Sequence, residues 1–214
     1  QIVQYVSAHD DLTLWDKLCI SMRDNASSCD FDASDPNSVA DIFSANILSA
    51  GLILCSAGMP FMLGGEEFGR TKHGCDNSYN RGVLMNQLDW SRAERFQPLV
   101  EWYSALIKLR AKNAEFYDAK RTHLTASDNT VLAEQIGSDL IVCVNPMNDA
   151  SATIDLPAKS PSPWRCVLDS TEYFAKWTGH DSGSCVSMLC DDNGSQRAVH
   201  VPPRTFVVLS RKRA

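Results

Sequence analysis

The chain has no excess of positive charge, no long apolar run and no internal repeat, and each of these absences excludes a class of protein. It carries 20 Lys and Arg against 26 Asp and Glu, for a formal net charge of −6. Without a basic stripe it cannot neutralise a row of phosphates, so no nucleic acid partner is expected. The longest apolar stretch, residues 47–63, is broken by Ser, Gly and Pro. A bilayer span needs about 20 apolar residues, so no membrane partner is expected.

The eight cysteines include no C-x-x-C pair, which argues against a zinc framework and against a disulfide scaffold. Cys55 and Cys143 lie inside the apolar runs LILCSA and LIVCVN, where a free thiol packs as a small hydrophobe. Free thiols favour a reducing compartment, so the predicted location is cytoplasmic. Secretion stays open, because the chain starts at Gln1 and a targeting segment would lie upstream. No calcium loop of recognisable spacing is present, and no cofactor is predicted.

Residues 1–118 show the alternation of strands and helices that is typical of an α/β fold. Residues 1–6 predict a short buried strand that opens into a polar loop, and residues 58–65 predict a second one. Apolar residues at helical spacing follow a capping-box-like start at Ser38. A second capping box at Ser91 begins a long amphipathic helix to about Arg110. The order is therefore β, α, β, α.

Residues 119–214 have a different sequence pattern, in which short β-prone runs are separated by Gly, Pro, Asn, Asp and Ser. Seven such runs begin at residues 131, 140, 152, 164, 185, 197 and 205. Seven strands in fewer than 100 residues predict an antiparallel β-sandwich. The predicted fold is thus α/β followed by all-β, with a domain boundary at residue 118.

His9 and Asp10 directly follow the first predicted strand. The carboxyl ends of parallel strands are where an α/β barrel keeps its chemistry, because the loops at that face converge on one pocket. Taken alone, the pair is weak evidence, and a hydrogen-bonded loop turn is the commoner explanation for it.

The residues around this pair carry a resemblance to a known family. Residues 6–18 read V-x-x-H-D-D-x-T-L-W-D-K-L. This segment resembles the seventh barrel strand of type I pullulanases and limit dextrinases, the α-1,6-glucan-debranching members of the α-amylase superfamily. Further similar motifs follow in the family's order: G-M-P-F-M-L-G-G-E-E-F at 58–68, R-T-K at 70–72, D-N-S-Y-N at 76–80, N-Q-L-D-W at 86–90 and V-P-P-R-T at 201–205.

The resemblance implies the last two βα units of a (β/α)8 TIM barrel, followed by a C-terminal β-sandwich. It implies retaining hydrolysis of α-1,6 linkages in pullulan, amylopectin or limit dextrins. The family's nucleophile and general acid lie on other barrel strands, so the isolated chain is predicted to be inactive. Its partners would be an α-glucan substrate and the missing N-terminal barrel portion. Two strands of an open barrel leave apolar surface and edges unpaired, so the chain should aggregate, dimerise or dock.

The resemblance also implies roles for single residues. Asp10 would stabilise the oxocarbenium-like transition state, and His9 would donate hydrogen bonds to hydroxyls of the same sugar. The implied substrate-binding residues are Asp11, Trp15, Arg70, Asp76, Asn77 and Tyr79.

Several of these assignments have alternatives. Trp15 could equally pack in a core, and Arg70 could be an ion-pair partner of Glu66 or Glu67. Asp11 stands where the family usually has Asn, which replaces a donor by an acceptor and adds a negative charge beside Asp10.

Two alternatives remain for the chain as a whole. It could be a non-catalytic α-glucan-binding or structural module. The region from Ala119 onwards could also serve merely to cap the barrel. In that region Trp164 and Trp177 are expected to be core or edge residues.

Overall fold

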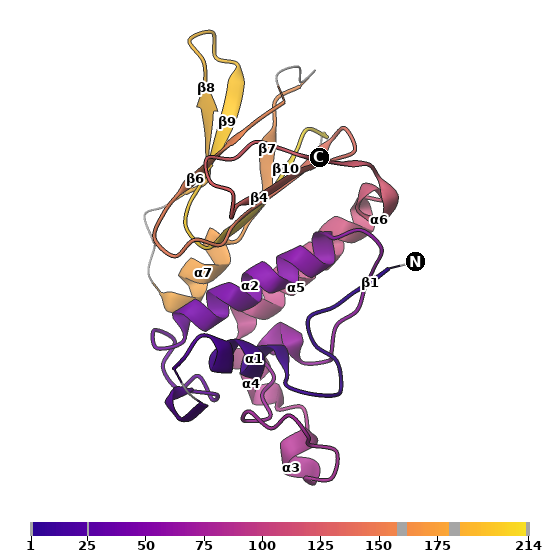
Figure 1. Cartoon of the computed structure of the whole chain (residues 1–214), viewed down its shortest axis with the longest axis vertical. Coiled ribbons are helices and arrows are strands. Elements are labelled where there is room, and N and C mark those ends of the chain that lie inside the picture. Colours follow the sequence, from indigo (N-terminus) through magenta and orange to yellow (C-terminus); the bar gives the residue numbers. More distant parts are fainter. Residues whose placement is uncertain (1, 25, 158–161, 180–184, 213–214) are drawn as a thin grey trace.

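The computed structural model describes residues 2–24, 26–157, 162–179 and 185–212. Helices and one short parallel sheet form the first half of the chain, and two antiparallel sheets form the second (Figure 1). The first half contains β1 (Val3–Gln4), α1 (Leu14–Ser21), the 3-10 turn η1 (Ala26–Ser28), α2 (Ala40–Cys55), β2 (Met59–Pro60), the 3-10 turn η2 (Glu66–Phe68), α3 (Val83–Asn86), α4 (Trp90–Arg95), α5 (Gln97–Lys112) and α6 (Glu115–Asp118). The second half contains β3 (Arg121–His123), β4 (Leu132–Ile136), β5 (Leu140–Asn145), β6 (Ala152–Asp155), β7 (Arg165–Asp169), α7 (Thr171–Thr178), β8 (Ser187–Cys190), β9 (Gln196–Val201) and β10 (Thr205–Ser210).

The strands form three sheets. β1 pairs in parallel with β2, with Val3 opposite Met59. The larger antiparallel sheet has the order β3-β4-β5-β10-β7, and the smaller one has the order β6-β9-β8. All seven strands predicted for the second half are present, while β3 and α7 were not predicted. The predicted boundary at residue 118 falls between α6 and β3, and the division into two domains stays a prediction.

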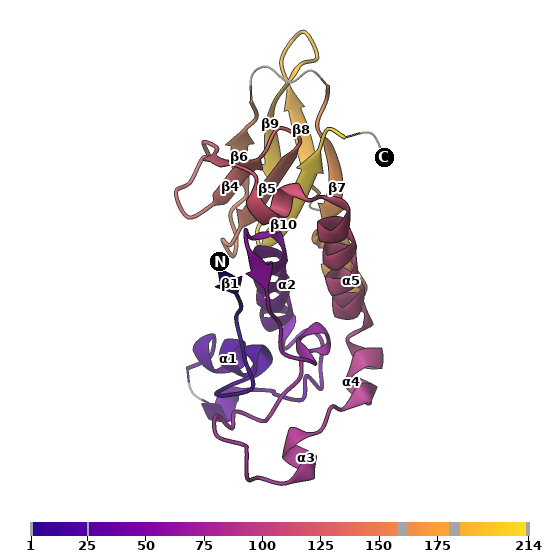
Figure 2. The same cartoon turned by 90° about the vertical axis from the view of Figure 1, so that its right-hand side faces the viewer.

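Strands β5 and β10 are buried along their whole length, because their sheet is covered on both faces. Alternate residues point to opposite faces of a strand. In β10, Phe206 and Val208 join one hydrophobic cluster with the helices, and Val207 and Leu209 join a second cluster with the smaller sheet. Helices α2 and α5 lie together beneath the larger sheet (Figure 2).

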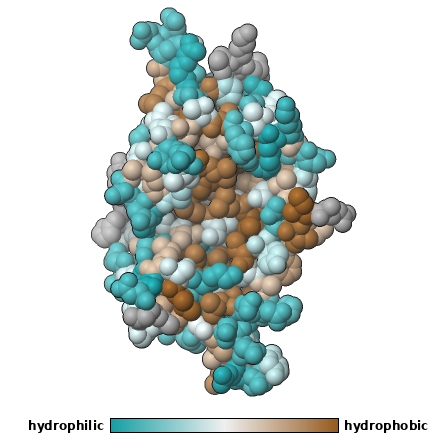
Figure 3. Space-filling view, viewed as in Figure 1, coloured by the Kyte–Doolittle hydropathy of each residue, from teal (hydrophilic) through white to brown (hydrophobic). Residues whose placement is uncertain are grey.

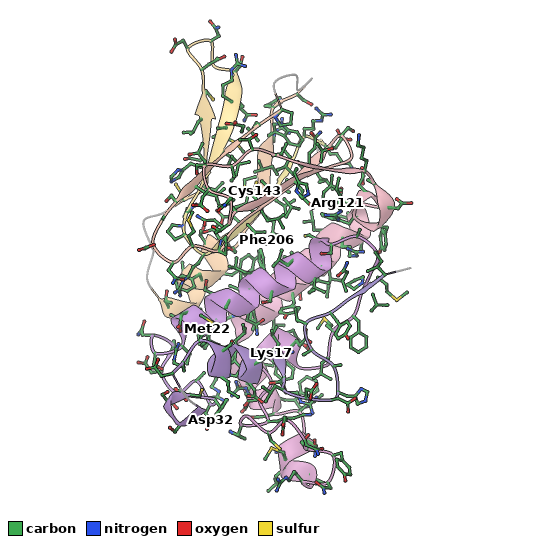
Figure 4. All side chains as sticks on the ribbon, viewed as in Figure 1. Lys17, Met22, Asp32, Arg121, Cys143 and Phe206 are labelled. Carbon is green, nitrogen blue, oxygen red and sulfur yellow. The ribbon has the colours of Figure 1, made fainter. Side chains whose placement is uncertain are left out.

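The contact between helices and sheet is close. Phe206 lies between α2 and the larger sheet (Figure 4), and its ring meets that of Trp102 on α5 edge-to-face at 5.9 Å. Gly51 on α2 faces the same ring, where any larger side chain would collide with it. The helices of the first half therefore share one core with the sheet of the second half.

Two helix predictions need correction. The helix predicted to start at Ser38 is α2, which begins at Ala40 after Val39 and has no side-chain cap, because the Ser38 hydroxyl donates to the Asp35 carbonyl at 2.8 Å instead. The predicted single helix from Ser91 to Arg110 is two helices with a break at Phe96. The cap of α4 is Asp89, whose carboxylate accepts from the Ser91 N–H at 3.0 Å.

Buried strands are predicted at residues 1–6 and 58–65. Strands do form there, but the prediction that they are buried is wrong. Each segment contributes only two residues to a sheet, and Val3 and Met59 are 52% and 62% exposed. Among the described residues each strand pairs with a single neighbour. Ile2, Tyr5 and Phe61 are exposed beside them, and hydrophobic residues are visible on this side of the molecule (Figure 3).

We call this surface the apolar groove. It is a hollow of about 550 Å³ lined by Ile2, Val3, Leu54, Gly58, Met59, Pro60, Ile107, Arg110, Ala111 and Tyr117. It faces outward between the parallel strand pair and the end of α5.

Cys19, Cys55 and Cys143 are buried and form no disulfide. Burial raises the pKa of Cys19, Cys55 and Cys143 to about 12 each, so these thiols pack in the core as neutral groups. Among the described helices, none has the length and apolar character needed to cross a bilayer.

Replacing Gly51 by Ala tests the packing of α2 on β10. The added methyl would lie 2.5 Å from a ring carbon of Phe206. Overpacking of this kind costs about 1–3 kcal/mol, so thermal unfolding should shift down by several degrees. Gly64→Ala is the matched control, since a methyl there meets nothing within 4 Å. Equal melting temperatures for the two variants would contradict the proposed tight contact.

Candidate functional site

A pocket lies where the loops after β1 and β2 meet, at the carboxyl ends of two parallel strands. It has a volume of about 330 Å³ and is lined by His9, Asp10, Leu63, Arg70, Lys72, Asp76, Asn77, Ser78, Tyr79 and Asn86. Six of the eight site residues predicted from the sequence are in this set. Asn86, the last residue of α3, is part of this lining, and α3 lies remote from the antiparallel sheets (Figure 1).

His9 and Asp10 present their side chains to solvent. Nε2 of His9 lies 3.3 Å from a carboxylate oxygen of Asp10, and both side chains are 83% exposed. The backbone of this loop is constrained at His9, because the Lys72 ammonium donates to the His9 carbonyl at 3.2 Å. The two functional groups are therefore free to contact a ligand on a loop whose course is constrained.

A buried carboxylate joins the two loops that bear the pocket. Glu66 accepts hydrogen bonds from the Ser7 hydroxyl and from the Leu63 N–H, the latter at 3.1 Å. Burial raises the pKa of Glu66 above its ordinary value, although the two hydrogen bonds oppose the shift. Glu66 thus holds the loop after β1 against the loop after β2.

A second buried carboxylate, Asp16, holds residues 71–72 in place, and Lys72 is part of the pocket lining. Thr13 caps α1 by accepting from the Asp16 N–H at 3.1 Å. The Asp16 carboxylate accepts from the Thr71 hydroxyl and from the Lys72 N–H, the latter at 2.7 Å. These residues lie within the motifs at 6–18 and 70–72, but no local pattern predicts a role for them. The signal that could have found Asp16 is an acid beside a core tryptophan in the first turn of a helix.

Arg70 lines the pocket and makes no ion pair with Glu66 or Glu67 among the described residues, so that alternative is wrong. Its terminal nitrogens donate to the carbonyls of Gly64 at 3.2 Å and Asn86 at 2.7 Å. Burial lowers the pKa of its guanidinium.

The loop that carries Asp76, Asn77 and Tyr79 is braced by an asparagine. The Asn86 amide donates to the Ser78 carbonyl at 2.7 Å, and its oxygen accepts from the Ser78 hydroxyl at 2.8 Å. Tyr79 stands out from this loop with 84% of its surface exposed. Ser78 and Asn86 also line the pocket, and sequence reasoning missed both.

Two predicted substrate contacts do not lie in the pocket. Trp15 is 1% exposed, donates to the Phe31 carbonyl at 3.1 Å and packs edge-to-face on Phe96 at 5.0 Å. Its indole offers no free face to a sugar ring, so the core alternative is correct. Asp11 is exposed but is not among the lining residues, and its backbone is in the left-handed region with φ 60°.

The pocket combines groups of both charges with neutral hydrogen-bonding groups. Carboxylates, an imidazole, a guanidinium, an ammonium, amides and a phenol all face an open hollow. Such a mixture suits a ligand rich in hydroxyl groups, since each hydroxyl both donates and accepts. Across the described residues, no three His, Cys, Asp or Glu side chains gather closely enough to hold a metal ion.

Comparison with known sequences finds debranching enzymes. No family model matches the chain. It is 36% identical over 116 residues to the pullulanase of Bacillus subtilis, which covers 54% of this chain and 14% of that protein. It is 30% identical over 130 residues to a glycogen debranching enzyme of Yersinia enterocolitica, which covers 50% and 19%. The chain therefore spans less than a fifth of the length of these curated relatives.

Comparison with solved structures finds pullulanases over almost the whole chain. The pullulanase of Bacillus acidopullulyticus matches with a TM-score of 0.69 and 27% identity, over 97% of this chain and 24% of that one. The apo pullulanase of Paenibacillus barengoltzii matches with a TM-score of 0.71 and 27% identity, over 100% and 30%. The latter enzyme has also been solved in complex with maltohexaose and α-cyclodextrin. The resemblance to pullulanases seen in the sequence is confirmed.

Replacing Glu66 by Gln should change how stability depends on pH. Because burial raises the folded pKa of Glu66 above 4.5, the folded chain binds the proton more tightly than the unfolded chain. Stability therefore falls as the pH rises from about 4.5 through the folded pKa, and then levels off. We compare the free energy of unfolding of wild type with that of Glu66→Gln. The difference, wild type minus variant, should decrease as the pH rises from about 4.5 through the folded pKa.

Chemical denaturation at a series of pH values measures this difference. Glu94→Gln, at an exposed position on α4, is the control for removal of a negative charge. A difference between wild type and Glu66→Gln that stays constant with pH would show that Glu66 does not act as a buried titrating link.

Proposed function

From this similarity to pullulanase-type debranching enzymes, we propose that the chain is the C-terminal portion of a glycoside hydrolase. The complete enzyme would cleave α-1,6-glucosidic branch linkages in pullulan, amylopectin or limit dextrins with retention of configuration. The observation that carries the proposal is the convergence of six predicted site residues on one pocket at the carboxyl ends of β1 and β2.

In this proposal β1 and β2 are the last two strands of a (β/α)8 barrel, residues 1–118 belong to that barrel and residues 119–214 form the sandwich domain. Two observations support it. β1 and β2 are parallel neighbours, each followed by helices. The apolar groove beside them exposes Val3 and Met59, as expected for strands that lack cover. The proposed partner for this surface is the N-terminal barrel portion of the same protein.

The proposed roles follow from charge development in the reaction. The transition state carries positive charge on the sugar ring, so the Asp10 carboxylate would stabilise it while holding the ring hydroxyls. His9 would donate to hydroxyls of the same sugar. A donor assists the rate only insofar as its bond strengthens in the transition state.

Arg70, Asp76, Asn77 and Tyr79 would bind the glucan chain along the pocket. The maltooligosaccharide complexes of the related pullulanases support a glucan ligand. A retaining hydrolase also needs a nucleophile and a general acid about 5–5.5 Å apart. We assign these two carboxyl groups to the remaining barrel strands, and no metal or redox cofactor enters the mechanism. The free, buried thiols support a reducing compartment, and we propose the cytoplasm.

Asp10→Asn in the complete protein tests the catalytic role. Loss of the charge should lower kcat on pullulan by roughly 10²- to 10³-fold, as for other groups that act on the transition state, with a smaller change in KM. Steady-state release of reducing ends measures both constants. Asp149→Asn, an exposed position far along the chain, is the matched control.

Two outcomes would contradict this proposal. If the complete protein binds glucan but has no turnover to lose, the chain is part of a non-catalytic glucan-binding module. If the 214-residue chain alone hydrolyses pullulan, the assignment of the nucleophile and acid to other strands is wrong.

The apolar groove gives a second prediction, for the isolated chain. With the groove uncovered, the chain should self-associate, because burying apolar surface is favourable. Met59→Lys should shift the chain towards a 23.6 kDa monomer in sedimentation velocity. Leu84→Lys is the matched control, because Leu84 is also exposed but lies on α3, away from the groove. A monomeric wild type would count against an uncovered barrel edge.

A further inference from the structure

A second pocket, which shares no residue with the first, lies where α7 meets the start of α2 and the loop that leads into β10. Its volume is about 270 Å³. Its polar lining comes from Ser44 on α2, Thr171 on α7, Thr205 on β10, Asn148 and Arg204. The motif at residues 201–205, which the candidate active site does not use, supplies one wall.

Ser44 contributes a hydroxyl to the lining of the second pocket. It is 2% exposed, and no described residue forms a hydrogen bond with its side chain. Ser49, on the same helix, instead donates to the Ala45 carbonyl at 2.8 Å. The Ser44 oxygen is accessible from the pocket, so a ligand bound there can exchange a hydrogen bond with it.

Arg204 is held over the pocket in an unusual backbone conformation. Its φ is 49°, a left-handed value that non-glycine residues rarely adopt. Its N–H donates to the Met147 carbonyl at 3.0 Å, and its Nε donates to the Asn148 side chain at 3.0 Å. Among the described residues, the two terminal nitrogens of the guanidinium have no hydrogen-bond partner. Strained residues that a protein retains often serve a ligand.

The charges around the pocket disfavour an anion. The Asp169 carboxylate already accepts from the Thr171 N–H at 2.9 Å, so it occupies the start of α7. Asp41 is close enough that Arg204 contributes to lowering the pKa of its carboxyl, after the larger effect of Arg23. Asp41 is itself paired with Arg23, so these two acids and two guanidinium groups leave no excess of positive charge beside the pocket.

The remaining lining is apolar and comes from Phe174 and the two prolines 202 and 203. An apolar wall opposite hydroxyl, amide and guanidinium groups matches a pyranose ring, which has C–H faces and a rim of hydroxyls. Ligand pockets usually have volumes of about 300 Å³ or more. The second pocket, at about 270 Å³, therefore has room for one sugar ring and not for a chain.

We propose that this second pocket binds one sugar unit of a neutral glucan, at a site separate from the candidate active site. Ser44 and the terminal nitrogens of Arg204 hydrogen-bond to the sugar hydroxyls, and Phe174 packs against the ring. The proposal goes beyond the proposed hydrolysis and does not require it, because it concerns binding to this chain alone.

Hydrogen–deuterium exchange of the 214-residue chain with and without maltose tests the site directly. Maltose should protect segments 38–48, 146–150, 170–176 and 202–206, in addition to any protection near His9 and Asp10. The method tolerates self-association of the chain. Absence of protection at the four segments under saturating maltose overturns the proposal. Protection by inorganic phosphate and not by maltose would identify an oxyanion site and also overturns it.

Two variants test the residues by calorimetric titration with maltose. Ser44→Ala should weaken the affinity of this site about two- to tenfold, the usual worth of one hydrogen bond. Ser49→Ala, the same change on the same helix, should leave it unchanged. Arg204→Gly keeps a positive φ accessible while removing the guanidinium, and should weaken binding by roughly tenfold or more.

If circular dichroism shows that Arg204→Gly does not fold, Ser44→Ala and Ser49→Ala still test the proposed site. Equal affinities for Ser44→Ala and Ser49→Ala would overturn the proposal. Failure of the hydrolysis proposal would appear as unchanged kcat in Asp10→Asn, which this titration does not measure, so the two failures are distinguishable.

Discussion

The burial of β5 and β10 on both faces determines how the other elements pack. A strand without a solvent face needs a covering layer on each side. The smaller sheet supplies one layer, and α2 with α5 supplies the other, where Phe206 meets Gly51 and Trp102. Because β1 and β2 flank α2 in the chain, the docking of α2 on the sheet also sets where the parallel strands and their loops lie.

The candidate site separates the groups that face a ligand from the groups that hold the loops. His9 and Asp10 are exposed, whereas Glu66 and Asp16 are buried. A buried carboxylate is tolerated only when hydrogen bonds satisfy it, and both of these accept from groups on another loop. The cost of burying two acids is thereby offset by bonds that restrict the loops. A site that must hold a sugar in one orientation benefits from such restriction.

Local patterns predicted the regular elements well where one physical rule dominated. The run LIVCVN and the run TFVVLS are strands because continuous β-branched and apolar residues suit a strand buried on both faces. The helix expected from Ser91 was less predictable. Its apolar spacing continues across Phe96, but Pro98 favours the first turn of a new helix, and Asp89 competes as the cap of the preceding one. β3 was missed because its three residues carry no apolar alternation.

Local sequence patterns suffice to predict the strands of the second half and the contiguous motifs that place His9, Asp10, Asp76 and Tyr79 on two loops. These features depend on neighbours along the chain. Tertiary structure alone decided that Trp15 is buried and which groups satisfy Glu66 and Asp16. The partners of those two acids lie more than 50 residues away, with separations of 59 and 56 positions. Such contacts exist only after the core has brought distant segments together, so no local pattern encodes them.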